Sequence, residues 1–260
     1  MQKAEQFRKA LRAREPLFGV FVKIPHPHIV EVLASSPLDF VVLDAEHSPF
    51  SLSQLDTCIL ATQTSSMNCL VRVSSHNKEE IGAVLDLGAD GIVVPHIKTR
   101  DDAKKIISAA LYHEGERGVS MSHRAGAYGS AGDVFDYTQL ADASTSIIVQ
   151  IEECEAVENL SDLLLEDRLD GFFIGKVDLA YSYGSRALDD AELSANINSA
   201  CDLIKQANRA LGSYVTDANR ALQLSESGHS FIALGSDHTH LKASVRNQLA
   251  EIISPGRTVL

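Results

Sequence analysis

The sequence lacks several features that mark large classes of proteins. Its four cysteines show no Cys-x-x-Cys spacing, which argues against a cysteine zinc site and favours isolated thiols in a reducing cytosol. No stretch approaches a membrane span, and the first residues carry no apolar signal-peptide core. The net charge of −12 comes without a basic cluster. We therefore expect a cytoplasmic protein without nucleic-acid or membrane partners.

Two further absences bear on the fold. No linker or second composition regime divides the 260 residues, and no Gly-x-Gly-x-x-Gly turn marks a dinucleotide-binding sheet. Instead, short apolar runs alternate with helix-length segments, as in parallel α/β proteins. An α/β fold, a single (β/α)8 TIM barrel over residues 1–260, fits better than an open doubly wound sheet.

The expected strands lie at 17–23, 40–44, 69–73, 91–94, 147–149, 171–174, 212–216 and 231–235. The expected helices lie at 5–14, 28–35, 51–63, 77–87, 100–111, 153–166, 189–209, 217–227 and about 237–253. A long stretch rich in glycine and serine, 113–133, is expected to be irregular, and loops of that length are usually functional or disordered.

Two acids follow neighbouring strands in the segment from Ile147 to Asp178. Glu152 comes after the first apolar run and Asp178 after the second. The carboxyl ends of barrel strands face the active site, so the two carboxylates should converge there. Converging carboxylates repel each other unless a proton or cation lies between them, and a divalent metal with oxygen ligands suits the place. The alternative is that both acids cap helices.

Other polar residues are expected on the same rim, and taken together they suit one reaction class. They are Lys23, Asp44, Glu46, His47, Arg72, His96, Gln150, Thr216, Ser236 and Asp237. A 2-keto acid could chelate the metal, and the cation would polarise its carbonyl group. Arg72 would stabilise oxyanion charge, and His47 would act as general base. Each residue taken alone has another interpretation: His47 could be a solvated loop residue, and Arg72 could only pair with a rim carboxylate.

These residues resemble the motifs of one family. The motifs are Leu43-Asp44-Ala45-Glu46-His47, Val71-Arg72-Val73, Leu85-Asp86-Leu87-Gly88-Ala89, Gly115-Glu116-Arg117-Gly118, Arg124-Ala125, Gln150-Ile151-Glu152 and Ile174-Gly175-x-x-Asp178-Leu179. Over roughly residues 15 to 240, the chain resembles the metal-dependent pyruvate aldolases of the HpcH/HpaI type. The resemblance implies reversible cleavage of a 4-hydroxy-2-keto or 2-keto-3-deoxy acid into pyruvate and an aldehyde.

The resemblance also assigns roles to residues. It implies that Glu152 and Asp178 bind Mg²⁺, or Mn²⁺ or Co²⁺ in its place, that His47 is the base, and that Arg72 stabilises the transition state. Gln150, the main chain at Val177, and Asp178 would hold the keto acid. Asp86 would raise the basicity of His47. Because Asp86 lies near the end of a returning helix, a capping or solvated role stays open for it.

The resemblance implies a homo-oligomer as well, a trimer or hexamer. In the hexamers of this family the last helix packs on a neighbouring subunit, which would give the helix at 237–253 a role at an interface.

The chain departs from the family pattern at two places. Lys176 follows Ile174-Gly175 where the family has proline, and metal-free aldolases carry their Schiff-base lysine at the end of strand six. Lys176 could pair with a carboxylate, change substrate choice or compete with the metal. Tyr112-His113-Glu114 replaces a Tyr-Pro-Pro-like segment, so the loop that receives the aldehyde is expected to differ. Two functional alternatives stay open: a citrate-lyase-like acyl carbon–carbon lyase, and a catalytically silent barrel that acts as a binding protein.

Overall fold

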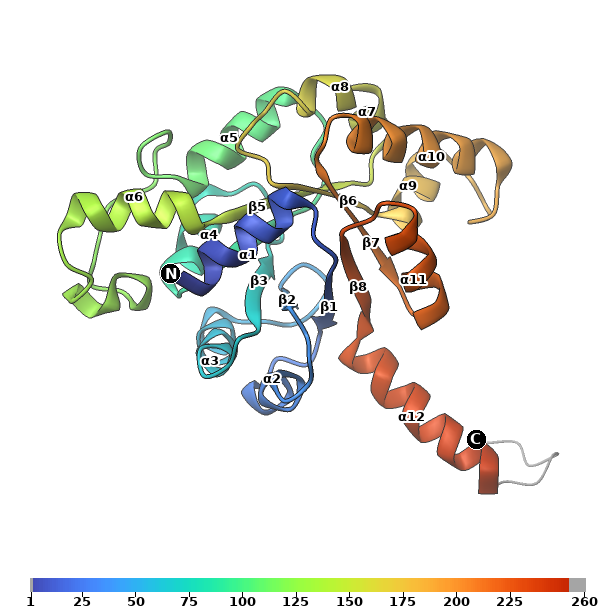
Figure 1. The fold of residues 1–260 in the computed structure, drawn as a ribbon, viewed down its shortest axis with the longest axis horizontal. Coiled ribbons are helices and arrows are strands. Elements are labelled where there is room, and N and C mark those ends of the chain that lie inside the picture. Colours follow the sequence, from blue (N-terminus) through green and yellow to red (C-terminus); the bar gives the residue numbers. More distant parts are fainter. Residues whose placement is uncertain (1, 253–260) are drawn as a thin grey trace.

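Eight parallel strands close into a barrel within residues 2–252, the part of the chain that this computed structural model describes (Figure 1). Each strand pairs with the next one along the chain, and β8 pairs with β1. The predicted α/β class, a (β/α)8 barrel, is therefore confirmed. The strands are β1 Leu17–Val22, β2 Phe40–Asp44, β3 Asn68–Arg72, β4 Gly91–Val94, β5 Ser146–Ile151, β6 Gly171–Ile174, β7 Ala210–Val215 and β8 Phe231–Ser236.

Helices surround the barrel and close its amino end. They are α1 Gln2–Ala13, α2 Pro27–Ala34, α3 Leu52–Thr62, α4 Lys78–Asp86, α5 Arg100–Ala110, the 3-10 turn η1 Arg124–Gly129, α6 Val134–Ser144, α7 Cys154–Glu158, α8 Leu160–Leu163, α9 Lys176–Ser182, α10 Ala191–Gln206, α11 Ala218–Glu226 and α12 Asp237–Ile252. The final residue of the last predicted helix, 253, lies outside the described residues.

The main difference from the predicted elements is α6, which the sequence did not reveal. Asp133 caps this helix by accepting hydrogen bonds from the backbone N–H groups of Phe135 and Asp136. Phe135 is 74% exposed, so the apolar residues of α6 do not mark one buried face. A smaller difference is that α10 ends three residues early, where Asn208 adopts a positive φ of 57°. Asparagine tolerates that conformation, which commonly ends a helix.

Alternation along the strands decides which polar side chains reach the mouth. Phe40 and Val42 point into the barrel, whereas Val41 and Leu43 pack under the helices. Successive strand residues face opposite sides, so Asp44 points inward like Phe40. The same parity sends Arg72 inward after Leu70, and Gln150 inward after Ile148. The apolar interior thus ends in a polar layer at the carboxyl ends of the strands.

Helix α1 closes the opposite end. It contacts β3 and β7, on opposite sides of the barrel, and its Phe7 and Leu11 join the interior cluster. The Phe7 ring packs against that of Phe40, with centroids 6.0 Å apart. A buried ion pair between Arg8 and Asp170, 2.9 Å long, fixes the helix in place.

Helix α12 extends from the end of β8 away from the other helices (Figure 1). Its Leu241, Val245 and Leu249 recur every four residues, so they lie on one face. They are 50%, 56% and 41% exposed. No helix within residues 2–252 is both long enough and apolar enough to cross a membrane.

Candidate active site

Asp44 and Arg72 form the centre of the polar layer. They are register partners at the ends of β2 and β3. Arg72 reaches Asp44 Oδ1 with Nε at 2.9 Å and Nη2 at 2.8 Å, while Lys23 Nζ lies 2.8 Å from Oδ2. Burial alone raises the pKa of Asp44, but Arg72, Lys23 and a backbone N–H lower it below its usual range. Asp44 is therefore an ionised anchor for two cations.

Gln150 links Arg72 to Glu152. Its Oε1 accepts from Arg72 Nη1 at 3.3 Å, and its Nε2 donates to Glu152 Oε2 at 2.6 Å. Glu152 is only 2% exposed, and Gly175 at the start of α9 leaves room for it. A Cβ on Gly175 would lie 2.8 Å from Glu152 Oε2. The Gln150 amide therefore holds the Glu152 carboxylate on one side, and the absence of a side chain at Gly175 leaves space for it on the other.

His96 lies between carboxylates that follow two other strands, β2 and β5. Its backbone N–H donates to Glu152 Oε1 at 2.7 Å, and it adopts a positive φ of 55°. Its ring Nε2 lies 3.1 Å from Glu46 Oε1 and its Nδ1 lies 3.1 Å from Glu153 Oε1. Burial alone lowers the pKa of His96, but the surrounding carboxylates raise it above the usual value. His96 thus helps to hold the acids of the mouth in place.

The proposed base, His47, lies at the open edge of the mouth. Its side chain is 55% exposed, and its Nε2 is 3.8 Å from Glu46 Oε2. Its backbone N–H donates to Asp44 Oδ1 at 3.1 Å, which fixes the turn after β2. The imidazole is therefore accessible to a substrate while its backbone is held by the buried acid.

Asp178 and its neighbours lie in the first turn of α9. Lys176, Val177 and Asp178 are all exposed at the end of β6. No side-chain cap hydrogen bond is formed at this end of α9. Burial raises the pKa of Glu152, and the nearby carboxylates of Glu46 and Asp178 raise it further, against the His96 N–H and ring. Asp178 is thus close enough to Glu152 to act on its charge, as expected for acids at neighbouring strand ends.

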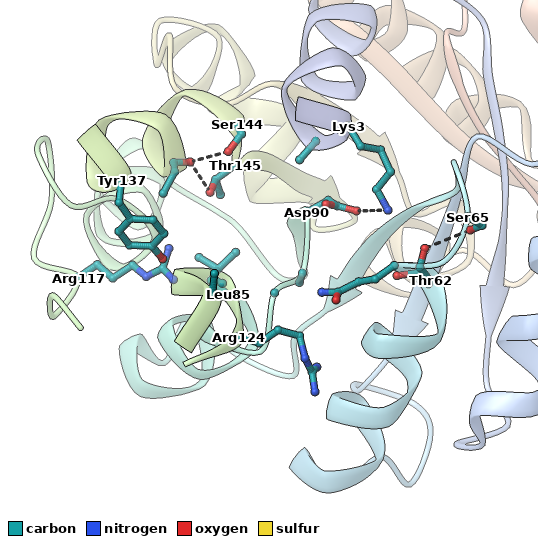
Figure 2. Close-up of a pocket in the computed structure, with 17 residues that line it drawn as sticks. Lys3, Thr62, Ser65, Leu85, Asp90, Arg117, Arg124, Tyr137, Ser144 and Thr145 are labelled. Atoms are coloured by element: carbon teal, nitrogen blue, oxygen red, sulfur yellow. Dashed lines mark hydrogen bonds and ion pairs between the residues drawn. The ribbon is translucent and has the colours of Figure 1, made fainter. Parts of the chain in front are cut away.

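Asp86 lies at the other end of the barrel. It is the last residue of α4, and its Oδ1 lies 2.7 Å from Arg117 Nη2 and 3.2 Å from His123 Nε2. Arg117 lines a cavity of about 500 Å³ near α1 and α6, at the amino ends of the strands (Figure 2). Within one chain the structure does not bring Asp86 to His47. Its expected effect on His47 stays a prediction that only an Asp86 from a second copy could satisfy.

The residues of the mouth fit a divalent cation. Ligand atoms of Glu46, His96 and Glu152 lie within 4.8 Å of one another, and Asp178 acts on Glu152 from the β6 side. A buried carboxylate whose pKa is raised by burial and by two further acids is a place where bound positive charge relieves repulsion. Carboxylate oxygens suit Mg²⁺ and Mn²⁺, whereas an imidazole also suits Co²⁺.

The mouth opens into a cavity of about 830 Å³ that runs towards β7, α10 and α11. Arg72, Gln150, Val177 and Asp178 all line it, so the predicted substrate-binding residues share one space. Phe21 and Tyr214 form part of its wall, with ring centroids 6.0 Å apart. The cavity therefore has room for a substrate considerably larger than pyruvate.

Four residues predicted on the rim have structural roles that the sequence did not indicate. They are Lys23, Asp44, His96 and Asp237. Asp44 and Lys23 form the anchor for Arg72, and the alternation after Phe40 was the signal that could have shown Asp44 to point inward. His96 gave no such signal, because its positive φ turns the chain out of the strand pattern. Asp237, expected at the open rim, is buried and accepts hydrogen bonds from the backbone N–H groups that follow β1.

Comparisons with known proteins identify the family of the chain. The profile of the HpcH/HpaI aldolase/citrate lyase family matches residues 17–243. The hydroxypyruvate/pyruvate aldolase of Roseobacter denitrificans is 31% identical over 233 residues, which cover 89% of this chain and 90% of the relative. The 5-keto-4-deoxy-D-glucarate aldolase of Escherichia coli is 31% identical over 237 residues, with the same coverage.

A solved structure is similar over nearly the whole barrel. It is an HpcH/HpaI aldolase/citrate lyase family protein from Burkholderia cenocepacia, with a TM-score of 0.91 and 27% identity, and the match covers 96% of this chain and 100% of that chain. The family match, the curated relatives and the shared fold agree over the same residues, and the chain belongs to the HpcH/HpaI aldolase/citrate lyase family.

Proposed function

We propose that the chain is a divalent-metal-dependent aldolase that reversibly cleaves a 4-hydroxy-2-keto or 2-keto-3-deoxy acid into pyruvate and an aldehyde. The observation that carries the proposal is the hydrogen-bonded series Asp44–Arg72–Gln150–Glu152 at the mouth of the barrel. It places a permanent positive charge, an amide and a candidate metal ligand side by side. Relatives that are 31% identical and named as aldolases support it over the citrate-lyase-like and silent-barrel alternatives.

We propose Glu152 and Asp178 as the residues that hold the cation, with Mg²⁺, Mn²⁺ or Co²⁺ as candidates. When bound, the cation would supply Lewis acidity towards the keto group of the substrate. Gln150 and the backbone N–H of Val177 would hold the keto acid. The Val177 N–H is in the first turn of α9, where backbone N–H groups have no partner within the helix.

The residues of the mouth supply the remaining chemistry. In the cleavage direction, His47 would accept the proton of the 4-hydroxyl group while the C3–C4 bond breaks. The electron pair of that bond passes to C3 as an enolate, and return of the proton from His47 to C3 gives pyruvate and restores the neutral imidazole. Arg72 would stabilise the oxyanion charge that develops, because its guanidinium is held in place by Asp44 before the reaction begins.

The proposal also covers assembly and location. The exposed apolar face of α12, formed by Leu241, Val245 and Leu249, supports a homo-oligomer in which α12 packs on a neighbouring subunit, a trimer or hexamer. The four free thiols support a cytoplasmic location.

The test is pyruvate release from a panel of 4-hydroxy-2-keto acids, coupled to lactate dehydrogenase. We expect activity that EDTA abolishes and that added Mn²⁺ or Mg²⁺ restores. Activity that survives full chelation would contradict the metal-dependent mechanism. A panel without any turnover, together with no Mn²⁺ binding, would contradict the aldolase function.

A further inference from the structure

The cavity beyond Arg72 and Gln150 is bordered by two further basic residues. Lys176 begins α9 directly after β6, and Arg220 lies in the first turn of α11 after β7. Strands β6 and β7 are neighbours in the barrel. Both cations therefore line the same cavity from adjacent strand ends, on the side opposite Asp44.

These two cations differ from the other basic groups of the cavity. Lys23 and Arg72 are each paired with Asp44 at 2.8 Å. Within residues 2–252, by contrast, neither Lys176 nor Arg220 takes part in a salt bridge. The guanidinium of Arg220 donates to the neutral Gln223 at 3.2 Å, and it is the backbone N–H of Arg220, not the side chain, that donates to Asp217. The chain as a whole carries a net charge of −12, so acids are in excess. Two basic side chains without a carboxylate partner on one cavity wall leave room for an anionic group of a ligand.

The position of the keto-acid residues indicates which part of the substrate would reach these cations. The proposed contacts of the keto acid, Gln150 and the Val177 backbone, lie at the ends of β5 and β6. The cavity continues from there past Tyr214 and Thr216 towards Arg220. A substrate held by its keto-acid end at β5 and β6 has this space for the carbon atoms that leave as the aldehyde.

We propose that Lys176, together with Arg220, determines aldehyde specificity by binding a carboxylate at the far end of the aldehyde. The inference rests on the proposed aldolase function and adds two residues to it. It assigns Lys176 a role in binding the substrate and no part in breaking or forming the carbon–carbon bond. In the condensation direction, an aldehyde that carries an acid group is then preferred over a neutral aldehyde of the same length.

The experiment compares two aldehydes of four carbons in condensation with pyruvate at saturating Mn²⁺: succinic semialdehyde and butanal. Wild type should have the higher kcat/KM with succinic semialdehyde. Lys176→Met keeps the apolar stem and removes the charge, and it should lower kcat/KM for succinic semialdehyde about tenfold while that for butanal changes less than about twofold. Arg220→Met should act in the same direction. High salt should reduce the wild-type preference, because these side chains are exposed to solvent.

Lys105→Met, on the outer face of α5, is the matched control and should leave both rates unchanged. Two results would overturn the inference: kcat/KM unchanged for both aldehydes in Lys176→Met, or an equal loss of kcat/KM for both. In the second case, trapping of a pyruvate imine on wild type by borohydride would assign Lys176 a covalent role instead. A wild type that condenses neither aldehyde but releases pyruvate from the keto-acid panel would overturn this inference alone. A wild type that turns over no member of the panel and binds no Mn²⁺ would refute the aldolase function, and this inference with it, so the two failures are distinguishable.

Discussion

Both Nε and Nη2 of Arg72 contact the same oxygen of Asp44, Oδ1, at 2.9 and 2.8 Å, while Lys23 occupies the other oxygen. This leaves Nη1 of Arg72 for Gln150, on the side of the cavity. Glu46 Oε2 lies 3.2 Å from the same Nε, so two acids orient the guanidinium towards the cavity, in a geometry that an ammonium group cannot reproduce.

Arg72→Lys should keep the charge and lose that geometry. We expect kcat/KM for cleavage to fall by about a hundredfold or more, as for the loss of one oxyanion contact. Steady-state kinetics of pyruvate release measure this. Arg100→Lys, which changes the surface pair with Glu166, is the control and should leave the rate unchanged. A similar rate in both variants would remove Arg72 from the mechanism.

Asp44 should make the stability of the fold dependent on pH. Its pKa in the folded protein is below the usual range, because Arg72 and Lys23 outweigh the effect of burial. The ionised group therefore stabilises the fold above the ordinary aspartate pKa of about 3.9, and that contribution is lost as the pH falls below it. Urea unfolding should show the largest difference between wild type and Asp44→Asn near neutral pH, and a smaller one near about pH 3. A difference independent of pH would contradict the ion-pair account.

Glu152→Gln and Asp178→Asn should each weaken the binding of Mn²⁺. Removal of a carboxylate ligand from a site with few protein ligands should lower the affinity at least about tenfold. Calorimetric titration with Mn²⁺ measures the affinity without reference to turnover. Glu155→Gln, an exposed change in α7, is the control. If Asp178→Asn binds Mn²⁺ as wild type does while Glu152→Gln does not, the cation is held on the side of Glu46 and His96 instead.

Gly175→Ala should disturb the proposed cation site through the volume of the added methyl group. The added Cβ would lie 2.7 Å from Glu152 Cβ and 2.8 Å from its Oε2, so the carboxylate must move. We expect loss of Mn²⁺ affinity and of activity, with a lower melting temperature. Gly82→Ala in α4 is the matched control, since its Cβ would meet nothing within 4 Å. That variant should gain about 0.4–1 kcal/mol in stability. A Gly175→Ala variant with the Mn²⁺ affinity and activity of wild type would show that Glu152 is not held as described.

The face of α12 offers a test of assembly. Val245→Asp places a charge among Leu241 and Leu249, and we expect it to shift the protein towards the monomer. Light scattering coupled to size exclusion measures the mass. Lys242→Ala on the same helix should leave the mass unchanged. A monomeric wild type, or an unchanged oligomer in Val245→Asp, would contradict the proposed packing of α12.

Much of the fold could be predicted because local pattern and global structure agree. The strand predicted at 40–44 has its observed bounds, because an apolar run that contains the β-branched Val41 and Val42 leads into a polar turn. Helix α6 could not be predicted, because its partners are α1 and the loop before it, and Phe135 faces solvent. Such a helix owes its stability to distant contacts and to its cap rather than to its own periodicity.

The residues of the site likewise divide into those that local sequence pattern predicts and those that it does not. Glu152, Arg72 and Gln150 follow from strand ends and alternation, and the structure joins them through hydrogen bonds. The contacts of His96 depend on a backbone turn that no spacing rule describes. Asp86 lies at the end of a returning helix, as its position in the sequence indicated, and pairs with Arg117 of its own chain, whereas its effect on His47 stays a prediction.

Closure of the barrel floor by α1, with Phe7 and Leu11 in the interior, leaves the mouth at the carboxyl ends of the strands as the opening of the barrel within residues 2–252. In the proposed binding mode, with pyruvate at Gln150 and the aldehyde in the cavity beyond it, pyruvate departs only after the aldehyde has left. Turnover should accordingly follow an ordered sequence, with pyruvate first to bind in synthesis and last to leave in cleavage. Product-inhibition patterns would carry this signature: pyruvate competes with the keto acid for the free enzyme, whereas the aldehyde does not.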